Sequence, residues 1–203
     1  MNVSNAPTDF SAWMGRTQEA EDVLSRNLIK RIAATFGEDT PADGAALPPL
    51  WQWCFFQEPV FEAQLGDDGH PARGGFLPPA DNRNRMWAGG RVEFIEPLKV
   101  GAEAHRLSTL LHIEEKHGRT GSLLFVTVSH DYSQNGQLCV REEQDIVYRE
   151  PNPPKLNSGE APEPGDWSET IAPTPTLLFR YSAVTFNGHR ARAHDRHLQP
   201  ARL

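Results

Sequence analysis

Four apolar segments between residues 86 and 150, separated by three glycine-bearing turns, constrain the fold of this chain more than any other feature. The turns lie near Gly101, at 116–121 and at 134–137. The segments are rich in β-branched and aromatic residues, which favour strands, and Asn135-Gly136 is typical of a two-residue hairpin turn. The pattern therefore predicts an antiparallel meander of four strands.

A long helix is predicted ahead of this meander, from Thr17 to Phe36. Acidic residues occupy its first turn, and Gly37 follows as a stop signal. Apolar residues recur at three- and four-residue steps, as on one face of a helix: Ala20, Val23, Leu24, Leu28, Ile32 and Ala33. We expect a helix of about four to five turns lying across the antiparallel sheet.

Two segments of different character join the helix to the meander. Residues 46–61 are the most aromatic stretch, and we expect Trp51, Trp53, Phe55 and Phe56 to pack in the core. Residues 66–85 have no periodicity and many turn residues, so they form a long ordered loop or a flap. Loops of this length tend to carry function.

Charge and composition exclude several function classes. The formal net charge is −7 over 203 residues, which argues against the basic face that a nucleic-acid partner requires. Cys54 and Cys139 lie far apart and are expected to be reduced, partly buried thiols. The first fifteen residues have no signal-peptide pattern, and no apolar run approaches ~18 residues. We therefore expect a cytoplasmic protein without a membrane partner.

Taken in order, these pieces resemble the double hot-dog enzymes of the MaoC-like hydratase and dehydratase superfamily. The resemblance is to the branch of mesaconyl-CoA hydratase and mitochondrial 3-hydroxyacyl-thioester dehydratase. Its motifs are LPPLWQWCFF, GHPARGGFLPP, RMWAGGRVEF, GRTGSLLFVTVSHDY, EEQDIVYRE and LFRYSAVTFNGHR. It implies an α+β hot-dog fold, in which an antiparallel sheet surrounds one long central helix.

The same resemblance implies one complete hot dog plus the first strand of a second. The divisions that we expect are an N-terminal segment at 1–16, the N-terminal hot-dog (MaoC-like dehydratase) domain at 17–150, a Pro-rich linker at 151–172, the start of a second hot dog at 173–190 and an aberrant tail at 191–203. The expected strand is TPTLLFRYSAVTF, residues 174–186. A shifted reading frame is the simplest account of the tail, which has no β-branched or aromatic residue.

The implied activity is hydration of an enoyl-CoA or dehydration of a 3-hydroxyacyl-CoA, with an acyl-CoA as substrate and partner and without a metal or redox cofactor. The catalytic element of the wider family reads Asp-x-Asn-Pro-x-His. Asn187 falls at the Asp of this element and His189 at its Asn, and both are expected to be catalytic. Arg192 holds the position of the catalytic His, and an arginine cannot act as a base near neutral pH.

Two hypotheses follow. The chain is a hydratase or dehydratase of the mesaconyl-CoA hydratase type with impaired activity, acting alone or with a complete partner. Alternatively, it is a non-catalytic acyl-thioester-binding or structural half of a hydratase assembly. In either case a lone hot dog leaves one face uncovered, so we expect a homodimer or another association through that face.

Substrate-binding residues are expected within the quoted motifs: Arg73, Gly74, Gly75, Arg83, Arg85, Trp87 and Arg190. Arg83 and Arg85, together with Arg91, could receive the phosphates of coenzyme A, or they could form a charged loop and strand edge. Gly74 and Gly75, with Gly89 and Gly90, would permit close approach of a ligand to the backbone, or they could form sharp turns.

Two histidine patterns have weaker interpretations. His189, His194 and His197 with Asp195 could form a metal site, but their spacing matches no zinc motif, and a solvated tail is the alternative. We expect no metal. His130 and Asp131 are adjacent on a predicted strand, where neighbouring side chains point to opposite faces, so no catalytic pair is expected.

Overall fold

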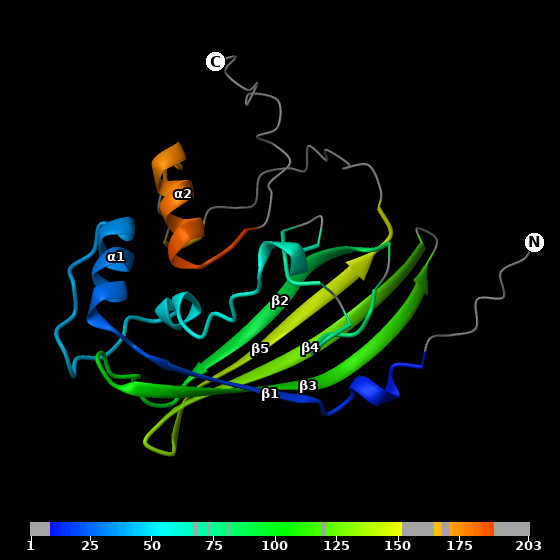
Figure 1. The fold of residues 1–203 in the computed structure, drawn as a ribbon, viewed down its shortest axis with the longest axis horizontal. Coiled ribbons are helices and arrows are strands. Elements are labelled where there is room, and N and C mark those ends of the chain that lie inside the picture. Colours follow the sequence, from blue (N-terminus) through cyan, green and yellow to red (C-terminus); the bar gives the residue numbers. More distant parts are fainter. Residues whose placement is uncertain are drawn as a thin grey trace, which may run out of the picture.

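The computed structural model describes residues 9–66, 69–72, 74–80, 82–118, 121–151, 165–167 and 171–188. Five strands form one antiparallel sheet in the order β1-β3-β4-β5-β2 (Figure 1). They are β1 (Thr17–Val23), β2 (Asn84–Phe94), β3 (Glu103–Gly118), β4 (Gly121–Gln134) and β5 (Gln137–Arg149). With the helices α1 (Arg26–Phe36) and α2 (Pro175–Val184), this is an α+β, hot-dog-like fold.

The four strands predicted between residues 86 and 150 are present, but their order differs from a meander. β3, β4 and β5 follow one another as hairpins, and the last turn places Asn135 at φ 51° and Gly136 at φ 75°. Positive φ at both residues is what a type I′ turn requires. β2 pairs with β5 at the far edge instead of with β3, because strand propensity sets the existence of a strand and not its partner.

The predicted helix from Thr17 was wrong over its first seven residues, which form strand β1. Thr17–Val23 pairs with β3, so that Thr17 lies opposite Thr109 and Val23 opposite Glu103. Exposed and half-buried residues alternate along it, which is the period of a strand with one face inward. The ladder offered by β3 outweighed the local helical pattern, which is a weak preference over so few residues.

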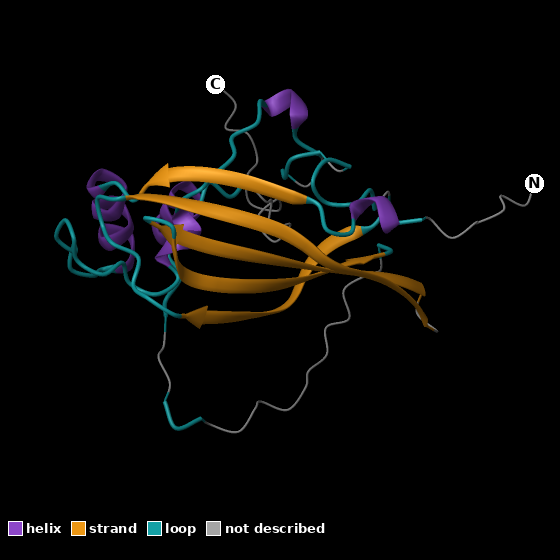
Figure 2. Ribbon diagram, turned by 90° about the horizontal axis from the view of Figure 1, so that it is seen from below, coloured by secondary structure: helices purple, strands orange, loops and turns teal. Residues whose placement is uncertain are grey.

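Helix α1 follows Ser25 and ends at Gly37, whose φ of 75° is the left-handed conformation of a helix C-terminus. Its eleven residues make about three turns, or about 16 Å. α1 therefore lies at one end of the sheet and not across it, as both views show (Figures 1 and 2). There it shares a buried core with the aromatic segment and with inward residues of β3, β4 and β5, including Ile29, Ile32, Trp51, Phe55, Ala104, Tyr132 and Val140.

A second buried cluster covers the inner face of the sheet near the β3–β4 hairpin. It contains Leu110, Leu124, Val126, Val128 and Tyr148, and Phe76, Leu77 and Ala80 of the long loop pack against or within it. The described part of the 66–85 loop is therefore an ordered cover for the sheet. Two apolar clusters thus occupy the two ends of the inner face, with polar residues between them.

The first strand of a second hot dog was also a wrong prediction, because residues 175–184 form helix α2. Thr174 caps this helix through its side chain, which accepts from the backbone N–H of Leu177 at 3.1 Å, and Pro175 occupies the first turn. The ring of Tyr181 meets that of Phe36 of α1 edge to face, 6.0 Å between centroids. The cap and this ring contact favour a helix, and no described strand pairs with the segment.

Cys54 and Cys139 are both buried and are not joined by a disulfide, in agreement with the sequence. Burial raises the pKa of the Cys54 thiol to about 11. Among the described helices, none has the length and apolar character needed to cross a membrane.

Candidate functional site

A cleft of about 800 Å³ lies between the inner face of the sheet, the aromatic segment and α2. Its sheet side is built from inward residues of β3, β4 and β5, and its opposite side from α2 and the residues that follow. The residues that matter for its chemistry are Trp53, Glu58, Arg106, His130, Gln144 and Asn187. The cleft occupies the polar zone between the two buried apolar clusters.

Three strands place a row of polar side chains across the floor of the cleft. Ser108 on β3 lies opposite His130 on β4, which lies opposite Glu142 on β5. The Ser108 Oγ is 2.8 Å from Nδ1 of His130. Burial, helped by the positive charge of Arg106, lowers the pKa of His130 to about 4. The imidazole is therefore neutral at pH 7, with Ser108 at its Nδ1.

Glu142 is buried and serves as the acceptor for three donors. It accepts from Nε1 of Trp53 at 2.9 Å, from the hydroxyl of Tyr132 at 3.2 Å and from Nε2 of Gln144 at 2.6 Å. Burial and the neighbouring carboxylate raise the pKa of Tyr132, so its proton stays in this network. The prediction that Trp53 packs in the core was wrong, because its side chain is 39% exposed in the wall of the cleft, where its indole N–H donates to Glu142.

Arg106 is the one arginine or lysine among the described residues that line the cleft. It lies one inward step along β3 from Ser108, and its Nη2 is 2.8 Å from Oε1 of Glu58. Its guanidinium carbon lies 5.8 Å from the centre of the Phe56 ring, within cation–π range. Sequence reasoning missed Arg106, although a basic residue on the inner side of a half-buried strand was a usable signal.

Asn187, expected to be catalytic, follows α2 and lines the same cleft. Its backbone N–H donates to the carbonyl of Ser182 at 2.8 Å. His189, Arg190 and Arg192 lie outside the described residues, and so do Arg73, His194, Asp195 and His197. The catalytic roles therefore stay predictions. In the described ranges, no three His, Cys, Asp or Glu side chains gather as a metal site would require.

The arginines considered for phosphate binding lie away from the cleft lining. Arg83 contacts Glu115 at 2.5 Å, and the Ser122 hydroxyl together with Arg83 holds the pKa of Glu115 below its usual range. Arg85 is half-buried on β2, opposite Tyr148 of β5. The contact of Arg83 with a carboxylate favours the charged-edge alternative for that residue, and the phosphate role stays a prediction.

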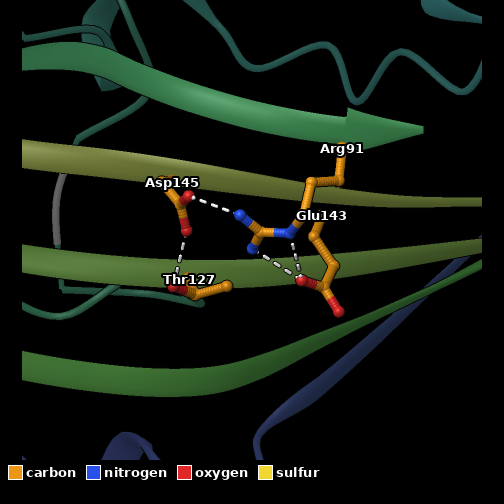
Figure 3. Close-up of polar contacts among 4 residues, drawn as sticks. All are labelled: Arg91, Thr127, Glu143 and Asp145. Atoms are coloured by element: carbon orange, nitrogen blue, oxygen red, sulfur yellow. Dashed lines mark hydrogen bonds and ion pairs between the residues drawn. The ribbon is translucent and has the colours of Figure 1, made fainter.

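Arg91 lies within a charged network on the outer face of the sheet (Figure 3). Its guanidinium contacts Glu143 at 2.6 Å and Asp145 at 3.0 Å. Asp145 also accepts from the Thr127 hydroxyl at 2.7 Å, and the Thr127 and Arg91 contacts lower the pKa of Asp145. The same face carries Asp131, paired with Arg141 at 2.8 Å, while His130 faces the cleft. The two neighbours point apart, as strand alternation predicts.

Two of the glycines considered for ligand approach have a role in the fold, and ligand approach stays a prediction for Gly74 and Gly75. Gly74 has φ 95°, so it provides a sharp turn. A Cβ on Gly90 would lie 3.0 Å from the carbonyl oxygen of Glu143 and 3.4 Å from the indole of Trp87. Gly90 therefore makes room for Trp87, which precedes a register shift in β2 and is 69% exposed.

The model of the hydroxyacyl-thioester dehydratase type 2 family matches residues 50–194 of this chain. The chain belongs to this family. The match spans the aromatic segment, the cleft and the Asn187 region. Membership confirms the resemblance on which the expectation of an acyl-thioester hydratase or dehydratase rests.

Individual relatives agree with this membership. Mesaconyl-C(4)-CoA hydratase of Chloroflexus aurantiacus is 44% identical over 191 residues, covering 90% of this chain and 67% of that protein. The mitochondrial hydroxyacyl-thioester dehydratase type 2 of Schizosaccharomyces pombe is 26% identical over 205 residues, covering 83% of this chain and 67% of that protein. The chain thus spans about two thirds of the length of both.

Among solved structures, HtdX of Mycobacterium tuberculosis superposes with a TM-score of 0.54 at 16% identity. The superposition covers 84% of this chain and 61% of that one. At this identity the similarity shows the fold alone, and it supports the assignment of the five strands and their helix to a hot-dog-like sheet.

Proposed function

We propose that this chain acts on coenzyme A thioesters as a hydro-lyase of the mesaconyl-CoA hydratase type. The supporting observation is the 44% identity over 90% of the chain, together with a cleft of suitable size in which Asn187 lines the side opposite the polar floor. Addition of water next to a thioester needs a base for the water, an acid for the α-carbon and donors for the thioester oxygen. The resemblance assigns the water to Asn187 and to the position of Arg192, where the family has its catalytic His, and it implies that His189 is catalytic as well.

In this proposal the acyl group lies along the floor formed by Arg106 and His130, and the thioester lies near Asn187. The Asn187 amide can orient a water but cannot accept its proton, so the base must come from the following residues. Arg192 stands where the family has that base, and an arginine keeps its proton near neutral pH. We therefore propose that turnover by this chain is impaired.

A second candidate function is acyl-thioester binding without turnover, as one half of a hydratase assembly. The observation that favours it is also Arg192, because a cleft can hold a thioester without a catalytic base. The division of the chain at residues 150 and 173 belongs to this proposal as well, since α2 and Asn187 would begin the second half.

Two assays on the same chain separate the two functions. Calorimetric titration measures binding of mesaconyl-CoA and crotonyl-CoA, and loss of enoyl-thioester absorbance measures hydration. Turnover at roughly one per second or faster supports an unimpaired enzyme and contradicts the Arg192 argument. Binding without turnover supports the second function. Failure of both thioesters to bind contradicts both functions. Arg192→His is the matched variant, with little rescue expected because one side chain does not supply the whole site.

A further inference from the structure

We propose that Gln52 closes the cleft against a smaller apolar pocket and so limits the length of the acyl group. The Gln52 side chain acts as a partition: short acyl groups fit in front of it, and the pocket behind it stays closed to them. This inference rests on the proposed function and adds to its site a residue that determines specificity and takes no part in the reaction.

The first step is the position of the smaller pocket. It has a volume of about 290 Å³ and lies where strand β2 ends. Its lining is mostly apolar and comes from the start of the aromatic segment, from the end of β2 with the residues after it, and from β5; it includes Leu47, Pro48, Phe94, Ile95, Leu98 and Val140. Gln52 lines both this pocket and the cleft, and no other described residue lines both.

The second step is the strand register, which places the boundary between the two cavities. One row of facing residues crosses β3, β4, β5 and β2, in the order Arg106, Tyr132, Val140 and Phe94. The first two residues of this row line the cleft, whereas the last two line the smaller pocket. The boundary in this row therefore falls between β4 and β5. Gln52 lines the cavities on both sides of that boundary, so it forms the partition.

The third step is the chemistry of the partition itself. The Gln52 side chain is 1% exposed, and its Nε2 atom is buried without a hydrogen-bond partner. Burial of an amide donor without a partner lowers the stability of a folded chain. An apolar side chain of similar length would fill the same space without this cost. The amide of Gln52 therefore does not serve the fold, and what matters for the cleft is the space that the side chain fills.

The fourth step is the difference between the two sides of the partition. On the cleft side, the acyl group meets a polar floor that includes Arg106 and His130. Behind Gln52, an alkyl chain would meet mostly apolar side chains. Each methylene that leaves water for an apolar pocket adds about fourfold to affinity. Gln52 withholds this gain from long acyl groups, and a smaller residue in its place would release it.

The experiment compares a short and a longer saturated thioester, butyryl-CoA and octanoyl-CoA, so that no turnover is needed. Calorimetry on the full wild-type chain is expected to show that octanoyl-CoA binds no more tightly than butyryl-CoA. Gln52→Ala joins the smaller pocket to the cleft. This variant should bind octanoyl-CoA about tenfold to a hundredfold more tightly than the wild type does, while its affinity for butyryl-CoA should change by less than about threefold.

Matched variants separate the volume of Gln52 from its amide. Gln52→Met removes the amide but keeps the length of the side chain, so it should bind both thioesters as the wild type does. Gln52→Ser is a second small variant and should show the same gain as Gln52→Ala, which keeps the test valid if one of them does not fold. An equal gain for octanoyl-CoA in Gln52→Met, or no gain in either small variant, would overturn the inference. So would a wild-type chain that binds octanoyl-CoA about tenfold more tightly than butyryl-CoA. Failure of the wild-type chain to bind either thioester would instead contradict the proposed function.

Discussion

The imidazole of His130, half-buried on β4, has its Nδ1 2.8 Å from the Ser108 hydroxyl oxygen. Its pKa is about 4 in the folded chain and about 6.5 when exposed. Between these values the unfolded chain binds the extra proton, so the free energy of unfolding must fall as the pH falls. The difference corresponds to about 3 kcal/mol, at about 1.36 kcal/mol per pKa unit.

We predict that the free energy of unfolding of the wild-type chain falls by this amount between about pH 7 and pH 4. In His130→Gln the contribution of His130 to this decrease should be absent. Urea unfolding at several pH values measures it. His112→Gln, which changes an exposed histidine, is the control and should keep the wild-type slope. The same slope in wild type and His130→Gln would show that burial of His130 does not control the acid response.

Glu142 is the shared acceptor of the buried Tyr132, the half-buried Gln144 and the indole of Trp53, which is 39% exposed. Glu142→Ala would leave the Trp53 indole, the Tyr132 hydroxyl and the Gln144 amide without this partner, so we expect a loss of about 3 kcal/mol in the free energy of unfolding. Glu143→Ala, one residue away on the outer face, removes an exposed contact with Arg91 and should cost about 1 kcal/mol or less. Comparable losses in the two variants, measured by denaturant unfolding, would contradict the network.

At the scale of elements, the β4–β5 hairpin depends on its turn. Gly136 has φ 75°, and a Cβ there would meet no atom within 4 Å, so any cost of Gly136→Ala comes from the backbone alone. We expect a loss of about 1–2 kcal/mol in thermal or denaturant unfolding. Gly89→Ala is the matched control, because Gly89 has no positive φ and its nearest contact is at 3.9 Å. An equal loss in both would reject the turn assignment.

At the scale of the whole molecule, strand β2 forms an open edge of the sheet. Met86, Trp87 and Phe94 on this strand are 45%, 69% and 51% exposed. Such an edge offers both unpaired backbone groups and apolar surface, so we predict self-association through it. Sedimentation should show a concentration-dependent species larger than 22.7 kDa, and Trp87→Lys with Phe94→Lys should shift it toward monomer. A monomer that also fails to bind a hydrophobic dye would count against this prediction.

Much of the local structure was encoded in short stretches of sequence. Asn135-Gly136 determined a hairpin turn because both residues tolerate positive φ, and Gly37 ended its helix for the same reason. The apolar segments between 86 and 150 correctly predicted four strands, and the quoted motifs correctly predicted the family. These features need only neighbours in the chain, so the sequence alone contains them.

Tertiary structure decided how the elements are used. Thr17–Val23 became a strand because β3 offered it a ladder, β2 paired with β5, and residues 175–184 became a helix capped by Thr174 and docked on α1. The floor of the cleft joins Ser108, His130 and Glu142 from three strands. The juxtaposition of these three residues could not be predicted from local sequence patterns, because strand register and burial depend on contacts between residues that are distant in sequence.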